Sequence, residues 1–597
     1  MSNNKTSHYI PPIDGLRALA VAAVLLYHLG VNWIPGGFLG VDLFFVISGY
    51  VITRLIIDTI NDRSALDLRR FYAGRAKRLL PALIFMILGT TVVIALWAPE
   101  AMGRFLADIP YVLSGTNNWR LVFLHQDYFQ AIGRPPFLQH TWSLAVESQF
   151  YLVWPIALIG IAKKFGKQNI TTAALAIAAI SGSALFLFSL HIDATNQRQT
   201  SHIYFGTDTH SLGLFLGAAL AVSWVPQNLS PRISQRAQDF VDGVGVIGLL
   251  GLLGTFLFIQ ESSATLYRLA FPLAGIFGCA ILTSIVHPAS RFAPLLSARW
   301  LVWIGQRSYG IYLWHWVIFQ VTRPSVDLAG SVLALNCARL LAVVALSEIS
   351  LRWIELPIRE GRVQDWFRGM KYRTPKVRLR QRWGTSLATG TVLVLFIAVS
   401  IFGNHRALSR SIPRGSAAYL PVGGQNDSLN LPSNISPSKT TAEKKVQGLW
   451  VTGDSVILGI HSKLEAHDHI GLINARVGRQ IQELTDVVRS DRWQMVGATV
   501  ILDLGNNNHL TESSVVELLD LLKKQPRIIL VNTAVPRSWR EDNDRIIAKV
   551  MKNYPQTTLV DWYALSQGHP EFFAPDGVHL SDLGGDVYVS AILEALK

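Results

Sequence analysis

The chain has 597 residues, half of them hydrophobic and only 16% charged, and its mean hydropathy is +0.30. Soluble globular chains carry about 25% charged residues, so this chain is not uniformly soluble, and its length allows more than one domain. Residues 448–597 hold 14 Lys and Arg against 19 Asp and Glu, a net charge of −5, whereas the rest of the chain carries +19. The two cysteines, Cys279 and Cys337, lie in apolar stretches, which excludes a disulfide framework.

Apolar stretches of about 20 residues, long enough to cross a membrane as helices, fill the first two thirds of the chain. We predict eleven spans, beginning near Ile13, Gly36, Leu80, His140, Thr171, Thr207, Val241, Leu269, Leu301, Gly330 and Thr385. The loops predicted on one side hold 23 Lys and Arg, and those on the other hold 5. Because cytoplasmic loops are rich in Lys and Arg, we expect a multi-pass membrane protein with its N-terminus in the cytoplasm.

Composition changes mark the expected domain boundaries. A transmembrane domain covers residues 1–360, and a basic cytoplasmic loop with one extra transmembrane helix covers 361–403. Residues 404–447 are rich in Ser, Pro, Asn and Gly, which is typical of a flexible linker. An odd number of spans places the remaining domain, residues 448–597, outside the cytoplasm. The excess of positive charge is explained by membrane topology and lipid contact, so we expect no nucleic-acid partner.

Short apolar runs alternate with helical stretches in residues 448–597. Strands are predicted in GLWVTGDSV, ATVILDLGNNN, RIILVNTAV and TLVDWY, with a helical period in SSVVELLDLLKK between two of them. This alternation predicts a three-layer α/β/α domain with a parallel sheet. Functional residues of such sheets collect beyond the carboxyl ends of the strands.

Residues suited to nucleophilic catalysis fall at those strand ends. Ser455 follows the first strand, and Asp576 and His579 lie in PDGVHL. A histidine can take the proton of a serine hydroxyl, and an aspartate three residues away could orient its ring. The backbone N–H groups of Ser455 and Gly478 and the side-chain amide of Asn507 could bind an oxyanion. Taken one at a time, such short motifs are more often turns, loops or structural histidines.

Together the four blocks resemble the SGNH hydrolase family: GDS at 453–455, Gly478, G-x-N at 505–507 and D-x-x-H at 576–579. The resemblance implies that Ser455 is the nucleophile, His579 its base and Asp576 the partner of the base. It also implies that Gly478 and Asn507 are oxyanion donors. Asn508 follows Asn507 where the family commonly has Asp or Gly, so the hydrogen bonding there is expected to differ.

Charged residues inside a membrane are costly and are therefore functional candidates. Arg17 and His28 lie eleven residues apart on the first span, which places them on one helix face about 16 Å apart. Glu147 lies one turn from Ser143 in the fourth span, and basic residues that include Arg75 and Arg78 precede the third. Snorkelling side chains, structural hydrogen bonds and plain topology explain each of these about as well.

These stretches resemble the acyltransferase-3 family of membrane acyltransferases. The marks are IDGLRALAVAAVLLYH, FLGVDLFFVISGYVIT, FYAGRAKRLLPAL, TWSLAVESQFYLVWP and SYGIYLWHW, in that order. The resemblance implies that the acyl donor is acetyl-CoA and that Arg17 and His28 are essential. Arg75 and Arg78 match the R-x-x-R element of the family, and Glu147 and Tyr309 fall in its other signature stretches.

The whole chain resembles fused bacterial carbohydrate O-acetyltransferases, and NTAVPRSW, DWYALSQGHPEFF and PDGVHLS favour the peptidoglycan branch. The hypothesis is a relay. Cytoplasmic acetyl-CoA, a substrate rather than a bound cofactor, gives its acetyl group through the helices to Ser455, and a hydroxyl of a cell-envelope glycan, most simply MurNAc of peptidoglycan, receives it. No metal is implied. O-antigen or exopolysaccharide acylation, a membrane-anchored glycan esterase, and a transporter with an external binding domain remain alternatives.

Overall fold

The structure, a computed structural model, describes residues 9–63, 66–124, 135–190, 197–260, 265–323, 328, 331–411, 448–466, 470–475, 479, 481–491, 497–507, 510–537, 539–574 and 577–597. The chain divides into two compact units. The first consists mainly of helices and ends at Arg406, and the second consists mainly of the residues that follow it. We refer to them as the helical unit and the sheet domain.

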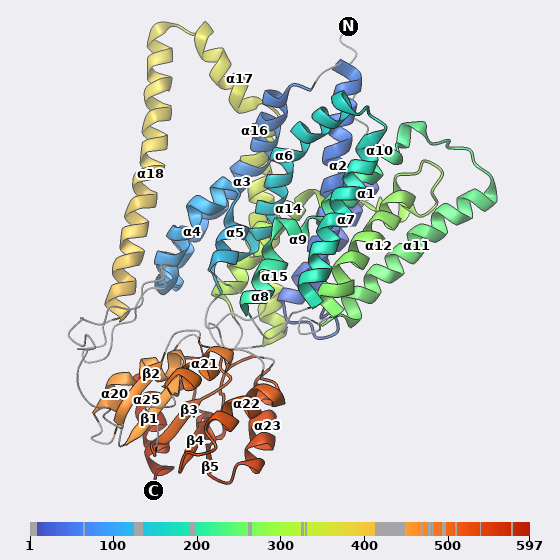
Figure 1. The fold of residues 1–597 in the computed structure, drawn as a ribbon. Coiled ribbons are helices and arrows are strands. Elements are labelled where there is room, and N and C mark those ends of the chain that lie inside the picture. Colours follow the sequence, from blue (N-terminus) through green and yellow to red (C-terminus); the bar gives the residue numbers. More distant parts are fainter. Residues whose placement is uncertain are drawn as a thin grey trace. The chain divides into compact units, whose positions relative to one another are not determined.

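Among the described residues of the helical unit eighteen α-helices begin, and Figure 1 shows their arrangement. Their bounds are α1 (Pro11–His28), α2 (Gly40–Arg63), α3 (Leu68–Trp97), α4 (Met102–Ser114), α5 (Asn117–Phe123), α6 (Trp142–Lys164), α7 (Asn169–Leu190), α8 (Gln197–Phe205), α9 (Thr207–His210), α10 (Leu212–Ser223), α11 (Gln235–Phe258), α12 (Phe271–Ile285), α13 (Ala293–Leu296), α14 (Arg299–Val321), α15 (Val332–Ile349), α16 (Leu356–Arg359), α17 (Arg362–Gly369) and α18 (Pro375–Ser411). Two π-helical turns, η5 (Leu266–Ala270) and η6 (Ser350–Glu355), lead into α12 and α16.

Eight helical segments among the described residues are long and apolar enough to cross a membrane. They contain α2, α3, α6, α7, α11, α12, α15 and α18. The other three predicted spans, near Ile13, Thr207 and Leu301, correspond to helices α1, α10 and α14. Helix α10 is short, whereas α1 and α14 carry polar side chains, such as Arg17, His28 and Arg307, that lower their hydropathy. The count of eleven spans therefore stays a prediction.

Helices α1 and α14 touch through their backbones because Gly305 lies at the contact. A Cβ atom added to Gly305 of α14 would lie 1.8 Å from the carbonyl oxygen of Asp14, and one added to Gly15 of α1 would lie 1.8 Å from that of Leu296 in α13. Any larger residue would force the helices apart, since real Cβ atoms never approach an oxygen so closely. Small residues allow such approaches between helices where lipid supplies no hydrophobic driving force. This contact fixes the position of α1 against α14.

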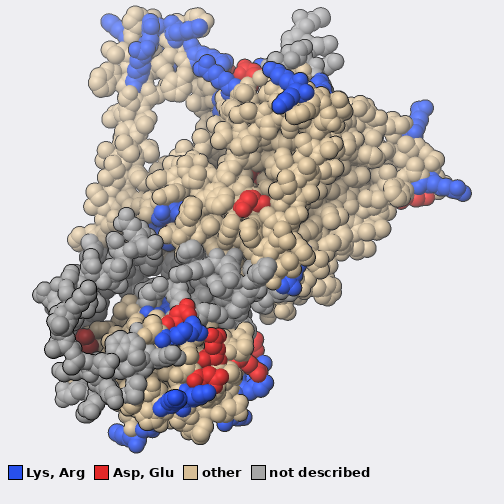
Figure 2. Space-filling view, viewed as in Figure 1, with Lys and Arg blue, Asp and Glu red and all other residues tan. Residues whose placement is uncertain are grey.

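Helix α18 lies beside the rest of the helical unit with most of its surface exposed (Figure 1). Near its end, Arg406 donates hydrogen bonds of 3.0 Å to the carbonyl oxygens of Ala95 and Leu96 in α3. The helix continues to Ser411, into the range 404–447 expected as a linker, and residues 412–447 lie outside the described residues. Figure 2 shows Lys and Arg gathered where α17 and the start of α18 lie.

The sheet domain contains a five-stranded parallel sheet with strand order β2-β1-β3-β4-β5. The strands are β1 (Leu449–Gly453), β2 (Ile470–Ala475), β3 (Thr499–Asp503), β4 (Ile528–Val531) and β5 (Thr557–Val560). The helices between and after them are α19 (Ser455–Gly459), α20 (His461–Glu465), α21 (Ile481–Asp491), α22 (Glu512–Leu521), α23 (Arg540–Val550), α24 (Trp562–Ser566) and α25 (Asp582–Glu594).

Successive side chains of each strand point to opposite faces of the sheet, so a hydrophobic core forms on each face. Trp450, Val500 and Leu530 pack with residues of α21, α22 and α23 on one face. Val451 and Ile529 pack with residues of α19, α20 and α25 on the other. The three-layer α/β/α architecture predicted from the sequence is therefore confirmed, and the carboxyl ends of β1 and β3 lie side by side.

Candidate functional site

The helical unit encloses a cavity of about 750 Å³, a size that suits a small-molecule ligand. All five residues predicted for donor binding or transfer line it, although they come from four helices: Arg17, Arg75, Arg78, Glu147 and Tyr309. The fold thus brings together residues that lie up to almost three hundred positions apart in the sequence. The role of each residue remains a prediction, but their meeting in one cavity is a structural fact.

Positive charge dominates the cavity wall. Seven arginines line it, against the carboxylates of Asp14, Asp58 and Glu147. Arg17 forms an ion pair with Asp14 at 3.2 Å, and Arg54 pairs with Asp58. The buried Nε of Arg75 has no hydrogen-bond partner among the described residues. Guanidinium groups bind phosphate oxygens in a planar fork, so this wall can hold a polyanion.

Glu147 and Tyr309 are held by hydrogen bonds within the wall. Tyr151 donates its hydroxyl to Glu147 Oε2 at 3.0 Å, one turn further along α6. Ser143, the neighbour considered from the sequence, is hydrogen-bonded at 2.8 Å to the hydroxyl of Tyr312 instead. Tyr309 donates its hydroxyl to the carbonyl oxygen of Leu79 at 2.9 Å, which ties α14 to α3.

His28 does not line the cavity but lies in a cluster of aromatic rings at the end of α1. Its ring centroid is 5.1 Å from those of His315 and Trp316, and His140 lies 5.9 Å from His315. His140 and His315 are also 5.7 and 5.3 Å from Tyr312, which does line the cavity. The three histidines therefore adjoin the cavity through Tyr312.

The hydrogen bond of His315 defines its tautomer. Its Nδ1 lies 2.6 Å from the carbonyl oxygen of Tyr312, so Nδ1 carries the proton and donates it. Nε2 then has a lone pair, and among the described residues it has no hydrogen-bond partner. In the sequence His315 stands within the motif SYGIYLWHW, and neither it nor His140 was selected as a site residue. The sequence did offer a signal for both histidines: His140 directly precedes the motif TWSLAVESQFYLVWP, and His315 lies within SYGIYLWHW.

The turn after β1 presents Ser455 at the start of α19. Asp454 caps this short helix by accepting the N–H of Val456 at 2.8 Å. Gly453 permits the sharp turn, because a Cβ atom there would lie 2.6 Å from Ile457 and 2.9 Å from Asp503. Ser455 is 5% exposed, and among the described residues its Oγ has no hydrogen-bond partner. Catalytic hydrogen bonds are often long in ligand-free sites, so this geometry is compatible with a nucleophile.

Asn507 lies beside that turn, at the end of β3. Its Nδ2 donates to Asp454 Oδ2 at 2.7 Å and to the carbonyl oxygen of Arg479 at 2.9 Å. Arg479 is anchored to the strand ends through Thr452 at 3.0 Å and Asn474 Oδ1 at 2.8 Å. The structure therefore brings Asn507 next to Ser455 through Asp454. Gly478 and Asp576 lie outside the described residues, and so does Asn508.

Gly505 shapes the loop that carries Asn507. Its φ of +86° is left-handed, and a Cβ atom there would lie 2.9 Å from both Asn543 and Thr533. Asn543 and Trp539 donate to its carbonyl oxygen at 2.9 and 3.3 Å. These hydrogen bonds from Asn543 of α23 and from Trp539 just before it thus fix the backbone of the loop that carries Asn507.

His579 is half-buried in the segment before α25 and interacts electrostatically with Asp454. It therefore lies near Ser455, which follows Asp454 in the chain. The backbone of this segment is fixed by a 2.7 Å hydrogen bond from Ala574 N–H to the His579 carbonyl oxygen.

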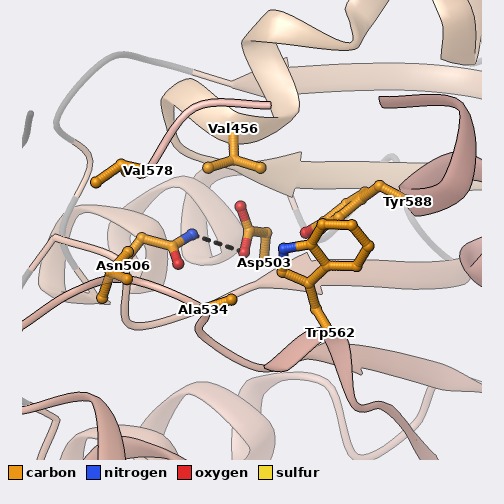
Figure 3. A pocket seen from close by; sticks show the side chains of 8 residues that line it. Val456, Asp503, Asn506, Ala534, Trp562, Val578 and Tyr588 are labelled. Atoms are coloured by element: carbon orange, nitrogen blue, oxygen red, sulfur yellow. Dashed lines mark hydrogen bonds between the residues drawn. The ribbon is translucent and has the colours of Figure 1, made fainter. Parts of the chain in front are cut away.

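Asp503, the last residue of β3, is a site residue that the sequence analysis missed. It follows Leu502, which pairs with Thr452 of the neighbouring strand β1, and Asn506 donates to its Oδ1 at 2.9 Å. It lines a small internal cavity beneath Ser455 together with Asn506, Trp562 and Tyr588 (Figure 3). Burial and the neighbouring Asp454 raise the pKa of Asp503 well above its usual range.

Residues 10–349 match the family described as an acyltransferase domain. The chain belongs to this acyltransferase family. The peptidoglycan O-acetyltransferase OatA of Listeria monocytogenes is 33% identical over 618 residues, which cover 99% of this chain and 98% of that protein. YrhL of Bacillus subtilis is 31% identical over 641 residues and both chains are covered completely. The solved C-terminal catalytic domain of OatA from Streptococcus pneumoniae, with a methylsulfonyl adduct, is 22% identical and covers 26% of this chain and 94% of that one, with a TM-score of 0.24.

The acyltransferase thus combines several apolar helices with a C-terminal α/β/α domain, and the predicted resemblance to a family of membrane acyltransferases is confirmed. It is an enzyme of the O-acyltransferase class, as its relatives are. The family match covers the helices that form the arginine-lined cavity up to Ile349. Arg352, Leu356 and Arg359, which complete the wall, follow the matched range.

Proposed function

We propose that this acyltransferase moves an acetyl group from cytoplasmic acetyl-CoA to a hydroxyl of an extracytoplasmic cell-envelope glycan. The observation that carries the donor half is the cavity where Arg17, Arg75, Arg78, Glu147 and Tyr309 meet. A coenzyme A thioester combines phosphate groups with a long, largely apolar arm. Arginines can hold its phosphates, and the cavity leads toward the rings of Tyr312, His315 and His28.

The acceptor half rests on the turn of Ser455. Ser455 Oγ attacks the acetyl carbonyl carbon while His579 takes the hydroxyl proton; the bond between the acetyl group and the group that delivered it breaks, and His579 passes the proton to that leaving group, so that an ester on Ser455 remains. Asn507 stabilises the oxyanion of the tetrahedral intermediate by turning toward it one of the two N–H groups that it donates to Asp454 and Arg479 in the ligand-free site, and the backbone N–H groups of Ser455 and Gly478 complete the donor set. A sugar hydroxyl then attacks the ester, returns the proton through His579 and leaves with the acetyl group. This chemistry makes Ser455 the last protein group that carries the acetyl group.

Peptidoglycan is the acceptor that we favour, because the Listeria relative that aligns with almost the whole chain is a peptidoglycan O-acetyltransferase. The cytoplasmic membrane and the external position of the sheet domain belong to the same proposal. They are supported by the charge difference between the two sets of loops and by the basic end of the helical unit near α17 and the start of α18 (Figure 2). A relay is needed because coenzyme A is inside the cell and the glycan is outside.

The activity test uses membranes that contain the full chain, acetyl-CoA labelled in the acetyl group, and peptidoglycan fragments. We expect label in the glycan with the wild-type chain and none with Ser455→Ala or His28→Ala. Transfer by Ser455→Ala would show that Ser455 is not the last carrier. Release of labelled acetate without labelled glycan would favour an esterase, and movement of an unmodified solute would favour a transporter.

The topology test uses cysteine labelling in a chain that lacks Cys279 and Cys337. Lys552→Cys places a thiol on an exposed position of the sheet domain, and Arg368→Cys places one on the basic loop at a side chain that is 78% exposed. A maleimide that cannot cross membranes should label the first in intact cells and the second only after permeabilisation. The reverse pattern would remove the basis of the relay.

A further inference from the structure

The side chain of Asn543, in helix α23, spans the loop that carries Asn507. Its Nδ2 donates a hydrogen bond to the carbonyl oxygen of Gly505 at 2.9 Å, and its Oδ1 accepts the backbone N–H of Leu510 at 2.7 Å. Gly505 precedes Asn507 in the chain and Leu510 follows it, so the two hydrogen bonds hold the loop on both sides of Asn507. The partners also fix the orientation of the amide, because a carbonyl oxygen only accepts and a backbone N–H only donates.

Asn543 is fully buried, with 0% of the residue exposed. Ile547, one turn further along α23, belongs to the same apolar core as Leu510. A buried amide that loses its hydrogen bonds costs free energy, so Asn543 stays with its partners. Leucine has a similar size but makes neither hydrogen bond. Asparagine supplies both the donor for one side of the loop and the acceptor for the other.

Helix α23 is itself anchored where Asn543 lies. The N–H of Asn543 donates to the carbonyl oxygen of Trp539 at 2.9 Å. The next residue, Asp544, accepts the N–H and the hydroxyl of Thr533, each at 3.1 Å, and Arg540 Nη1 donates to its other oxygen at 3.2 Å. Thr533 lies two residues after β4, the strand that pairs with β3, so these contacts tie α23 to the sheet. Asn543 therefore holds the loop from a fixed base.

The loop presents the side-chain amide of Asn507. Its Nδ2 donates at 2.7 Å to Asp454, the residue before Ser455, so a small shift of the loop moves this amide relative to the nucleophile. The left-handed backbone of Gly505, with a φ of +86°, lets the loop pass so close to α23 that a Cβ atom there would lie 2.9 Å from Asn543. Oxyanion donors act because they are already in place, and a misplacement of about 1 Å can cost about 100-fold in rate.

We propose that Asn543 is a positioning residue that holds both sides of the loop and so presents the amide of Asn507 to the oxyanion. This inference rests on the proposed function, in which that oxyanion forms at Ser455. Asn543 acts through the loop and not on the reacting atoms. Its loss should lower kcat and leave KM nearly unchanged, because the Asn507 amide serves the transition state more than the bound substrate.

The kinetic test uses the full-length chain in membranes, with p-nitrophenyl acetate as the probe ester. Asn543→Leu removes both hydrogen bonds, and we expect the Ser455-dependent kcat to fall at least 10-fold with KM within about 3-fold of wild type. Asn553→Leu, at an exposed position of the same domain, is the control and should leave both constants unchanged. An unchanged kcat in Asn543→Leu, or a loss confined to KM, would overturn the proposal.

A double-mutant cycle separates positioning from a general loss of stability. In a chain that already carries Asn507→Ala, the addition of Asn543→Leu should lower kcat by less than about 3-fold, because the amide that Asn543 positions is gone. Two losses that multiply would show that Asn543 does not act through Asn507, and the proposal would be wrong.

Hydrogen exchange reports on the loop independently of turnover. In Asn543→Leu the backbone N–H of Leu510 loses its acceptor, so its exchange should become at least about 10-fold faster, while the β3 and β4 peptides keep their wild-type rates. Unchanged exchange at Leu510 would contradict the proposal. If Asn543→Leu does not fold, Asn543→Ala, which removes the same two hydrogen bonds, takes its place in every measurement. If the wild type shows no Ser455-dependent turnover, the proposed function fails, and the exchange of Leu510 alone decides whether Asn543 holds the loop.

Discussion

The rings of His28 and His315 lie with their centroids 5.1 Å apart, on two helices whose backbones touch at Gly305. His28 was selected from the sequence as essential, and the fold supplies a second imidazole beside it. The anchored Nδ1 of His315 leaves the lone pair of Nε2 available to accept a proton. We therefore expect His315 to take part in the donor half of the reaction.

Replacement of His315 should interrupt the donor half of the reaction. His315→Phe keeps a planar ring in the fully buried site but removes both nitrogens, and general acid–base groups contribute at least about 100-fold to rate. We expect acetyl transfer from acetyl-CoA to fall by about that factor, while ester hydrolysis at Ser455 is unchanged. His202→Phe, whose histidine side chain is 37% exposed, is the control. Normal transfer by His315→Phe would remove His315 from the reaction.

Removal of an arginine from the cavity should weaken donor binding. Hydrogen bonds to charged groups contribute about 1.5–3 kcal/mol, so Arg78→Ala should lower kcat/KM for acetyl-CoA by about 10- to 100-fold, mainly through KM. Arg78→Lys should recover part of the loss because it restores the charge but not the fork. Arg368→Ala, outside the cavity, should have no effect. An unchanged KM in Arg78→Ala would place the phosphates elsewhere.

Loss of the Asn507 amide should slow the chemistry at Ser455 without preventing substrate binding. Removal of one oxyanion donor typically costs about 10²- to 10³-fold in kcat, and we expect that range for Asn507→Ala with p-nitrophenyl acetate. Asn553→Ala, at an exposed position of the same domain, serves as the matched control. A loss confined to KM would contradict the assignment of Asn507 to the oxyanion site.

The stability of the sheet domain should decrease as the pH rises. The pKa of Asp503 is raised in the folded domain, whereas an unfolded aspartate titrates near about 3.9. The folded state therefore binds the extra proton above about pH 4, and its stability falls until the folded pKa is passed. Asp503→Asn should remove this contribution. The measurement is hydrogen exchange of the β1 and β3 peptides from pH 5 to 9, corrected for intrinsic rates; an equal slope in wild type and variant would contradict it.

A single methyl group at the contact between α1 and α14 should destabilise the helical unit. In Gly305→Ala the new Cβ would overlap the Asp14 carbonyl oxygen, and overpacking of this kind costs about 1–3 kcal/mol. Gly243→Ala in α11 meets no atom within 4 Å and should be tolerated. Thermal unfolding in detergent compares the two. Equal midpoints for both variants would show that the helices can separate without cost.

Periodicity in the sequence predicted the layers of the sheet domain well and one of its two edge strands poorly. The central strands β1, β3 and β4 are buried and mostly apolar, which the sequence shows directly, and the half-buried edge strand β5 was predicted in TLVDWY. The edge strand β2 was missed, because residues such as Gly471 and Asn474 weaken the pattern of IGLINA. Helices α1 and α14 are too polar to meet the hydropathy criterion for a membrane span, because they carry polar residues that face the protein interior.

The candidate site was predictable where residues form motifs and not where they act through neighbours. Ser455 and Asn507 fall in recognisable blocks, and the five cavity residues were found through the family resemblance. Asp503 looks like an ordinary polar end of a strand, and only the fold reveals that it meets Asp454 from the adjacent strand. His140 was missed likewise, because its ring neighbours His315 and Trp316 are more than one hundred residues away in sequence.

The glycine contact between α1 and α14 also constrains how a ligand can enter. The backbones of α1 and α14 meet at Asp14 and Gly305 with no room for a side chain between them, so these two helices cannot approach each other further there. Arg17 on α1 and Tyr309 on α14 both line the cavity. We therefore expect the other lining helices, such as α3 and α6, to make the adjustments that admit a bulky acyl donor.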